Sequence, residues 1–130
     1  MYHVIESVES NLGEYKFYEH HVILTAYEGV DINLQHSSEI VSLLNRKMKK
    51  PFGWISNKVN SYSANPLIML DVVPNVPLLK SYCGVIYNDE SKDYTKYGKK
   101  VVPVDFPLGK FNDINEAVEW TLDIVGVKDL

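Results

Sequence analysis

The residues best suited to chemistry in this chain cluster in one short polar stretch between an apolar strand and an apolar helix. Six of its uncharged side chains can donate or accept hydrogen bonds, namely Asn57, Asn60, Ser61, Tyr62, Ser63 and Asn65. In a largely parallel sheet, function tends to lie in the loops that leave the carboxyl ends of the strands. Amides at the start of the following helix would favour a bound or covalently attached anion. These six residues are therefore the candidate binding site.

Ser63 has two interpretations. It precedes Ala64-Asn65-Pro66, and a proline is tolerated in the first turn of a helix because the amides there have no intrahelical partner. Ser63 is therefore predicted to be the N-cap of the helix, a role in which replacement by Ala costs about 0.5–2 kcal/mol. The alternative is a regulatory serine, and a capping role does not exclude it.

Other residues that could support catalysis or bind a metal lack suitable neighbours in the sequence. His20 and His21 are adjacent, so on extended backbone they point to opposite faces and do not readily chelate one ion. Cys83 lies in an apolar strand, which predicts a buried and inert thiol. Glu28 and Asp31 stand at a strand end, where carboxylates commonly serve as caps. Without a glycine-rich phosphate loop or a nucleophile elbow, we expect no enzyme activity, no cofactor and no metal.

The first half of the chain predicts strands followed by a helix. Residues 2–8 and 14–18 are rich in Tyr, Val, Ile and Phe and are separated by turn-forming residues, which indicates a hairpin. The near-continuous apolar run at 21–27 suits a strand covered on both faces. Asn33 is a plausible N-cap for a helix over about 34–48, whose apolar residues recur at helical spacing.

The second half continues the alternation of strands and helices. Strands are expected at 52–59 and 79–87, and the helix entered through Pro66 should stop near Pro74. The remaining expected elements are a helical piece over 91–99, a short or edge strand of undefined limits within 101–111, and a last helix capped by Asp113 with Glu116 three residues later. Alternating elements of this kind predict a largely parallel sheet.

Length and composition describe one ordinary globular domain over residues 1–130. The 45% apolar and 23% charged content is far from disordered or membrane-spanning compositions, and no apolar run is long enough to cross a bilayer. The N-terminus has no basic region followed by an apolar run, so we expect a cytoplasmic protein. A net charge of −4 disfavours nucleic acid as a partner, since such binding depends on neutralising phosphates.

Three segments give the chain a resemblance to a known fold. They are YEGVDINL, PFGWISNKVNSYSANP and FNDINEAVEW, within an order of elements that covers nearly the whole chain from about Gly13. Together they resemble the STAS domain, the sulfate-transporter and anti-sigma-factor-antagonist fold, and in particular its small stand-alone bacterial relatives. The resemblance implies an α/β domain with a mixed sheet of four or five strands and about four helices.

The resemblance also implies a mode of regulation. In anti-sigma-factor antagonists, phosphorylation of a serine in the turn before the second helix abolishes binding to a partner kinase. Ser63, and secondarily Ser61, stand at the matching turn and are the phosphorylation candidates. The usual family pattern there is Asp-Ser-Ser-Gly, whereas this chain has Ser61-Tyr62-Ser63-Ala64.

The sequence thus favours a non-enzymatic regulatory module that binds a protein partner through the face around residues 57–65. The sheet arrangement also resembles the Sec14-like lipid-binding domain, so the alternative is a protein that binds a small hydrophobic ligand or lipid; an enzyme is the least favoured reading. Sheet edges left partly open by the first hairpin and by the proline-bearing last strand favour self-association into a homodimer.

Overall fold

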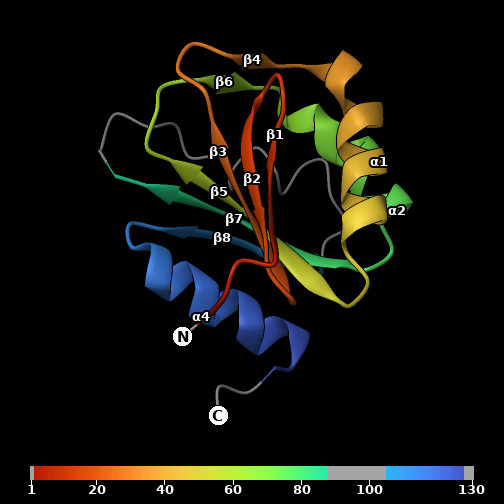
Figure 1. Ribbon diagram of the computed structural model, residues 1–130, viewed down its shortest axis with the longest axis vertical. Helices are drawn as coiled ribbons and strands as arrows, with labels where there is room; N and C mark the ends of the chain where they lie inside the picture. The colour runs from red at the N-terminus through yellow and green to blue at the C-terminus, as the bar shows by residue number, and fades with distance from the viewer. Residues whose placement is uncertain (1, 88–104, 128–130) are drawn as a thin grey trace.

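The computed structural model describes residues 2–87 and 105–127, which form a mixed six-stranded sheet with helices on both faces (Figure 1). The strands are β1 (Glu6–Glu9), β2 (Gly13–Phe17), β3 (His21–Ala26), β5 (Phe52–Lys58), β7 (Leu79–Ile86) and β8 (Leu108–Phe111). A separate two-stranded sheet is made by β4 (Asp31–Ile32) and β6 (Ser63–Ala64). The described helices are α1 (Ser37–Lys47), α2 (Met69–Asn75) and α4 (Ile114–Val125), with short 3-10 turns η1 (Leu34–His36) and η2 (Pro66–Ile68).

The main sheet has the order β1-β2-β3-β5-β7-β8. The first two pairings are antiparallel, and the strands from β3 to β8 pair in parallel. The carboxyl ends of β3, β5 and β7 therefore meet at one edge of the sheet. The loops that follow β3 and β5 carry β4 and β6, so the small sheet lies at that edge (Figure 1).

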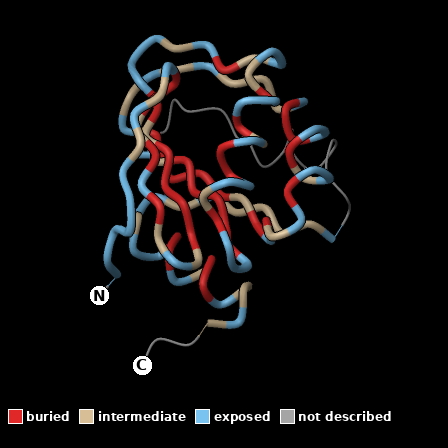
Figure 2. The backbone as a smooth tube through the Cα atoms, turned by 45° about the vertical axis from the view of Figure 1, so that its right-hand side comes forward, coloured by how far each residue is buried: buried red, intermediate tan, exposed pale blue. Residues whose placement is uncertain are grey.

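The sheet has a hydrophobic core on each face. On one face Phe52 and Trp54 of β5 belong to a core that includes side chains of α1 and α2, while on the other face Ile55 belongs to a core that includes Val118 of α4. This division follows from the two-residue period of a strand. The buried stretches in Figure 2 accordingly run along the central strands.

Close packing of α4 on the sheet depends on Gly53. A Cβ atom at this position would lie 2.2 Å from Cγ2 of Thr121 and 2.5 Å from Oγ of Ser81. The absence of a side chain therefore allows the helix to approach β5. Asp113 caps the start of α4 by accepting from the amide of Asn115 at 2.7 Å.

Several sequence predictions are confirmed and others are wrong. The α/β class, the first hairpin and the caps at Asn33 and Asp113 are confirmed. The expected four or five strands are wrong, because the main sheet has six, and three α-helices rather than about four lie in the described ranges. The helical piece expected at 91–99 lies outside them. None of the helices over 2–87 and 105–127 is long and apolar enough to cross a membrane.

His21 begins β3, in agreement with the strand expected at 21–27, and it is 2% exposed. Its imidazole stacks on Tyr18 with ring centroids 4.1 Å apart, and its Nδ1 has no hydrogen-bond partner. Burial lowers the pKa of His21 from 6.5 to about 4, with a smaller contribution from the charge of His20. The folded state therefore holds His21 neutral at pH values where the unfolded chain would protonate it.

Acidification should destabilise the protein through His21. Because the folded pKa lies below the unfolded value, stability is retained above pH 6.5 and is lost as the pH falls toward 4. From pH 7 to pH 5 the loss should be about 2 kcal/mol. Denaturant unfolding at both pH values measures this loss of stability. His21→Phe is the control, because it keeps an aromatic ring and removes the titratable group. An equal loss in wild type and His21→Phe would contradict the assignment.

Candidate functional site

The loops after β3 and β5 are joined by a small set of hydrogen bonds that we call the β4–β6 clip. In the backbone, the amide of Ser63 donates to the carbonyl of Val30 at 3.0 Å, and the amide of Asn65 donates to the carbonyl of Ile32 at 2.9 Å. The side-chain hydroxyl of Ser63 also donates to Oδ1 of Asp31 at 2.7 Å. The clip therefore fixes the position of β6 beside β4.

The prediction that Ser63 caps the following helix is wrong. Ser63 lies within β6 and is exposed, with its hydroxyl on Asp31. The N-cap is Asn65, whose Oδ1 accepts from the amide of Leu67 at 3.0 Å, with Pro66 in the first position of η2. Both residue types are good caps, so the two-residue shift could not be read from the motif alone.

The other candidate residues bond mainly to neighbouring parts of the fold. Nδ2 of Asn60 donates to the carbonyl of Ala26 at 2.9 Å, and the amide of Ser61 donates to Glu28 Oε2 at 2.5 Å. Asn57 accepts from the hydroxyl of Tyr87 at 2.6 Å. The six residues are thus near one another in the chain but do not converge on one point, and most of their polar groups hold the loop in place.

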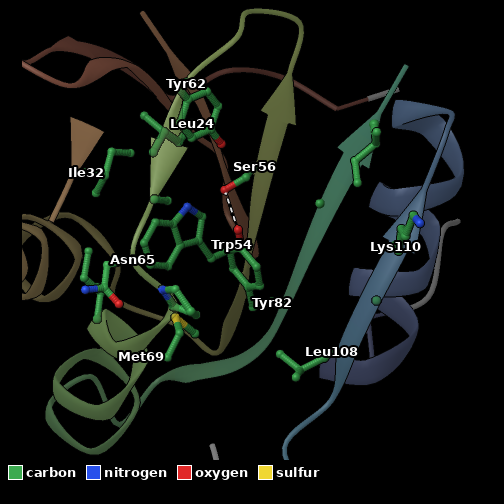
Figure 3. A pocket seen from close by; sticks show the side chains of 16 residues that line it. Leu24, Ile32, Trp54, Ser56, Tyr62, Asn65, Met69, Tyr82, Leu108 and Lys110 are labelled. Carbon is green, nitrogen blue, oxygen red and sulfur yellow. Dashed lines mark hydrogen bonds between the residues drawn. The ribbon is translucent and has the colours of Figure 1, made fainter. Parts of the chain in front are cut away.

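An apolar pocket lies behind the clip, between the sheet and η2 (Figure 3). The sheet contributes Leu24, Trp54, Tyr82, Ile86 and Leu108. The other wall is made by Ile32 of β4, Ala64 of β6, Tyr62 before β6, Ile68 of η2 and Met69 of α2. The pocket has a volume of about 70 Å³, measured as the space open to the centres of water molecules. Two of the six sequence candidates, Tyr62 and Asn65, line it.

Trp54 gives this apolar pocket an unsatisfied hydrogen-bond donor. Its side chain is 5% exposed, and Nε1 has no hydrogen-bond partner. Figure 3 shows the indole ring between Leu24 and Ile32 on one side and Tyr82 on the other, and the rings of Trp54 and Tyr82 meet edge to face at 5.3 Å. A buried polar group without a partner costs about 1–3 kcal/mol, so an acceptor that enters the pocket would recover this free energy.

Further hydrogen-bonding groups border the pocket. Tyr82 donates its hydroxyl to Ser56 Oγ at 3.0 Å (Figure 3), and Lys58 Nζ donates to the hydroxyl of Tyr62 at 2.7 Å. Lys58 is only 8% exposed, and burial lowers its pKa from 10.5 to about 8. A buried ammonium group beside an apolar pocket is a feature that sequence reasoning missed, because Lys58 lies within a stretch that reads as an ordinary strand.

The remaining candidates for reactive groups are buried in the core or engaged in local hydrogen bonds. The prediction of a buried Cys83 is confirmed, since it is fully buried, and burial raises the pKa of its thiol to about 12. Glu28 accepts a hydrogen bond from the amide of Ser61, and Asp31 accepts one from the hydroxyl of Ser63. Over residues 2–87 and 105–127, no three His, Cys, Asp or Glu side chains gather in a way that could hold a metal ion.

Comparisons of the chain with protein-family profiles, with curated proteins and with solved structures find no match. The STAS resemblance therefore stays a prediction, and function has to be argued from the geometry of the pocket and the clip.

Substitutions at Ser63 should distinguish a clip from a cap. Ser63→Ala removes one exposed hydrogen bond and should cost about 0.5–1 kcal/mol. Ser63→Asp brings a second carboxylate to Asp31, and like charges a few ångströms apart repel by about 1 kcal/mol even in water. Ser63→Asp should therefore be the less stable variant, in denaturant unfolding at low salt.

The control for this repulsion is the double variant Ser63→Asp with Asp31→Asn, which should regain most of the stability lost in Ser63→Asp. High salt should narrow the difference between Ser63→Asp and Ser63→Ala, because exposed charges are screened. If Ser63→Asp is instead as stable as the wild type, the contact of Ser63 with Asp31 does not contribute to stability and the role given to it in the clip is wrong.

Proposed function

We propose that this protein binds a small, mainly apolar molecule in the pocket between the sheet and the β4–β6 clip. The observation that carries the proposal is the buried indole N–H of Trp54, which has no partner and belongs to a side chain that lines the pocket. Ligand pockets are typically apolar with a few well-placed polar groups, and they favour the carboxyl ends of parallel strands. This pocket has both properties.

The size of the pocket limits the ligand. One water needs about 10–15 Å³ of the same kind of space, so a volume of about 70 Å³ accepts several waters or part of one small organic molecule. A single ring or a short alkyl chain suits this space, whereas the two chains of a phospholipid do not. The ligand should therefore insert a compact apolar portion and offer a hydrogen-bond acceptor to Trp54.

A protein-interaction role for residues 57–65, with Ser63 as a phosphorylation switch, ranks second. Ser63 is exposed, which suits modification, but a phosphate there would stand beside the carboxylate of Asp31 and break the hydrogen bond that joins β6 to β4. The polar groups that were expected to meet a partner are mostly bonded within the fold. A ligand pocket therefore explains more of the geometry than a polar docking face does.

Binding of octan-1-ol tests the proposal. Of the two tryptophans, Trp54 lines the pocket, whereas Trp120 packs against Phe111 on the opposite face of the sheet. In a two-dimensional ¹⁵N NMR spectrum, octan-1-ol should shift the indole N–H signal of Trp54 and leave that of Trp120 in place. The spectrum of Trp54→Phe lacks the Trp54 indole signal and so assigns the two indole N–H signals. Absence of a saturable shift with octan-1-ol and with indole would overturn the proposal.

A larger side chain at position 84 should block the pocket. Gly84 lies on its sheet side, and a Cβ atom there would meet only the flexible side chain of Lys58, with Cε at 3.1 Å. Gly84→Val should therefore keep the fold and weaken octan-1-ol binding by at least about tenfold. Gly84→Ala should fall between Gly84→Val and the wild type. Thermal unfolding reports whether each variant is folded, and full binding by folded Gly84→Val would place the ligand elsewhere.

A further inference from the structure

We infer that the ligand is an organic anion whose carboxylate lies over Gly84, between Ser56 and Lys110, with its apolar part in the pocket. This inference rests on the proposed function and adds the chemical class of the ligand. Medium-chain fatty acids and small aryl-acetic acids are the classes that fit.

Strand register places the relevant residues in one row. Ser56 of β5 pairs with Gly84 of β7, and Gly84 pairs with Lys110 of β8. All three line the pocket. Neighbouring strands are about 4.8 Å apart, so the backbones at Ser56 and Lys110 are about 10 Å apart. Gly84 between them contributes no side chain, and the stem of Lys58 borders the gap, with Cε 3.1 Å from where a Cβ atom of residue 84 would lie. A planar carboxylate with hydrogen bonds of about 2.8 Å on either side fits this width.

The groups around Gly84 are hydrogen-bond donors. Ser56 Oγ accepts from Tyr82, which leaves its own proton for a ligand, and Nε1 of Trp54 has no partner. Lys110 is exposed, and its ammonium forms no hydrogen bond or ion pair with other described residues. An uncharged ligand with one weak acceptor would satisfy few of these donors. A carboxylate has two oxygens with about four acceptor sites and matches them better.

The described residues that line the pocket carry charge of one sign. No Asp or Glu is among the described residues that line the pocket, whereas Lys110 lines it and the stem of Lys58 lies against Gly84. Apolar walls made by Leu24, Ile32 and Leu108 lower the local dielectric, which strengthens the attraction between an ammonium and a carboxylate. An anion bound here would also favour the charged form of Lys58, whose pKa burial lowers to about 8.

A comparison of two ligands with the same chain length tests the inference. Octanoate is ionised at neutral pH and octan-1-ol is not, so the two differ in the head group. Isothermal titration calorimetry of the full chain at low salt should give an affinity for octanoate at least about tenfold higher than for octan-1-ol. Octylamine has the opposite charge and should bind more weakly than octan-1-ol. Octyl phosphate distinguishes a carboxylate site from a site for a doubly charged phosphate.

Lys110→Met supplies the matched variant, because Met keeps an unbranched side chain and removes the charge. It should lower the affinity for octanoate by about tenfold and change that for octan-1-ol by less than about twofold. Lys49→Met is the control at an exposed lysine between α1 and β5, remote from the pocket residues in the structure, and should change neither affinity. Added salt should weaken octanoate binding and leave octan-1-ol binding nearly unchanged.

The outcomes separate this inference from the proposed function. If octanoate and octan-1-ol bind equally well, or if Lys110→Met leaves octanoate affinity unchanged, the anionic class is wrong while the apolar pocket stands. If octyl phosphate binds more tightly than octanoate, the carboxylate assignment is overturned in favour of a phosphate. If neither octanoate nor octan-1-ol shifts the indole signal of Trp54, both the inference and the proposed function fail.

Discussion

β5 is buried on both of its faces, and the rest of this structure depends on that constraint. The strand pairs with β3 on one side and β7 on the other, and its two faces contribute to different cores. Phe52 and Trp54 face the α1 and α2 side, while Gly53 and Ile55 face α4. A shift of one residue in its register would exchange these sets and place Phe52 where Gly53 meets Thr121. Such a shift would be incompatible with both cores.

The same strand determines what lies in the pocket. Because Trp54, Ser56 and Lys58 alternate with the residues that face α4, they follow one another along one face toward the carboxyl end of β5. Their character changes in that order from aromatic to hydroxyl to ammonium. The pocket therefore becomes more polar from the core outward, and an amphipathic molecule would have a defined orientation in it. Burial of the indole N–H of Trp54 without a partner and of the ammonium of Lys58 costs free energy that the surrounding core has to offset.

The α/β class, the hairpin and most elements could be predicted from the sequence because they depend on local periodicity. The apolar alternation of residues 52–59 and the caps at Asn33 and Asp113 are visible within a few residues of the chain. The pocket was not predictable in the same way, since Trp54, Gly84 and Lys110 are brought into proximity only by the parallel register of three strands. Ser63 was misplaced because its partner, Asp31, lies 32 residues earlier in the chain. A motif shows which caps are available and does not show which one is used.

The small size of the clip has a consequence for how such a protein can diversify. Its two strands have two residues each and come from loops, and several of its bonds lie at the surface. Ile32 and Ala64 nevertheless form one wall of the pocket. Substitutions or insertions in these loops would reshape that wall while the double-sided packing of β5 stays intact, because loops tolerate change better than the elements that they connect. The wall made by Ile32 and Ala64 can thus change shape in isolation, whereas the wall made by Trp54 cannot, because Trp54 also belongs to the hydrophobic core.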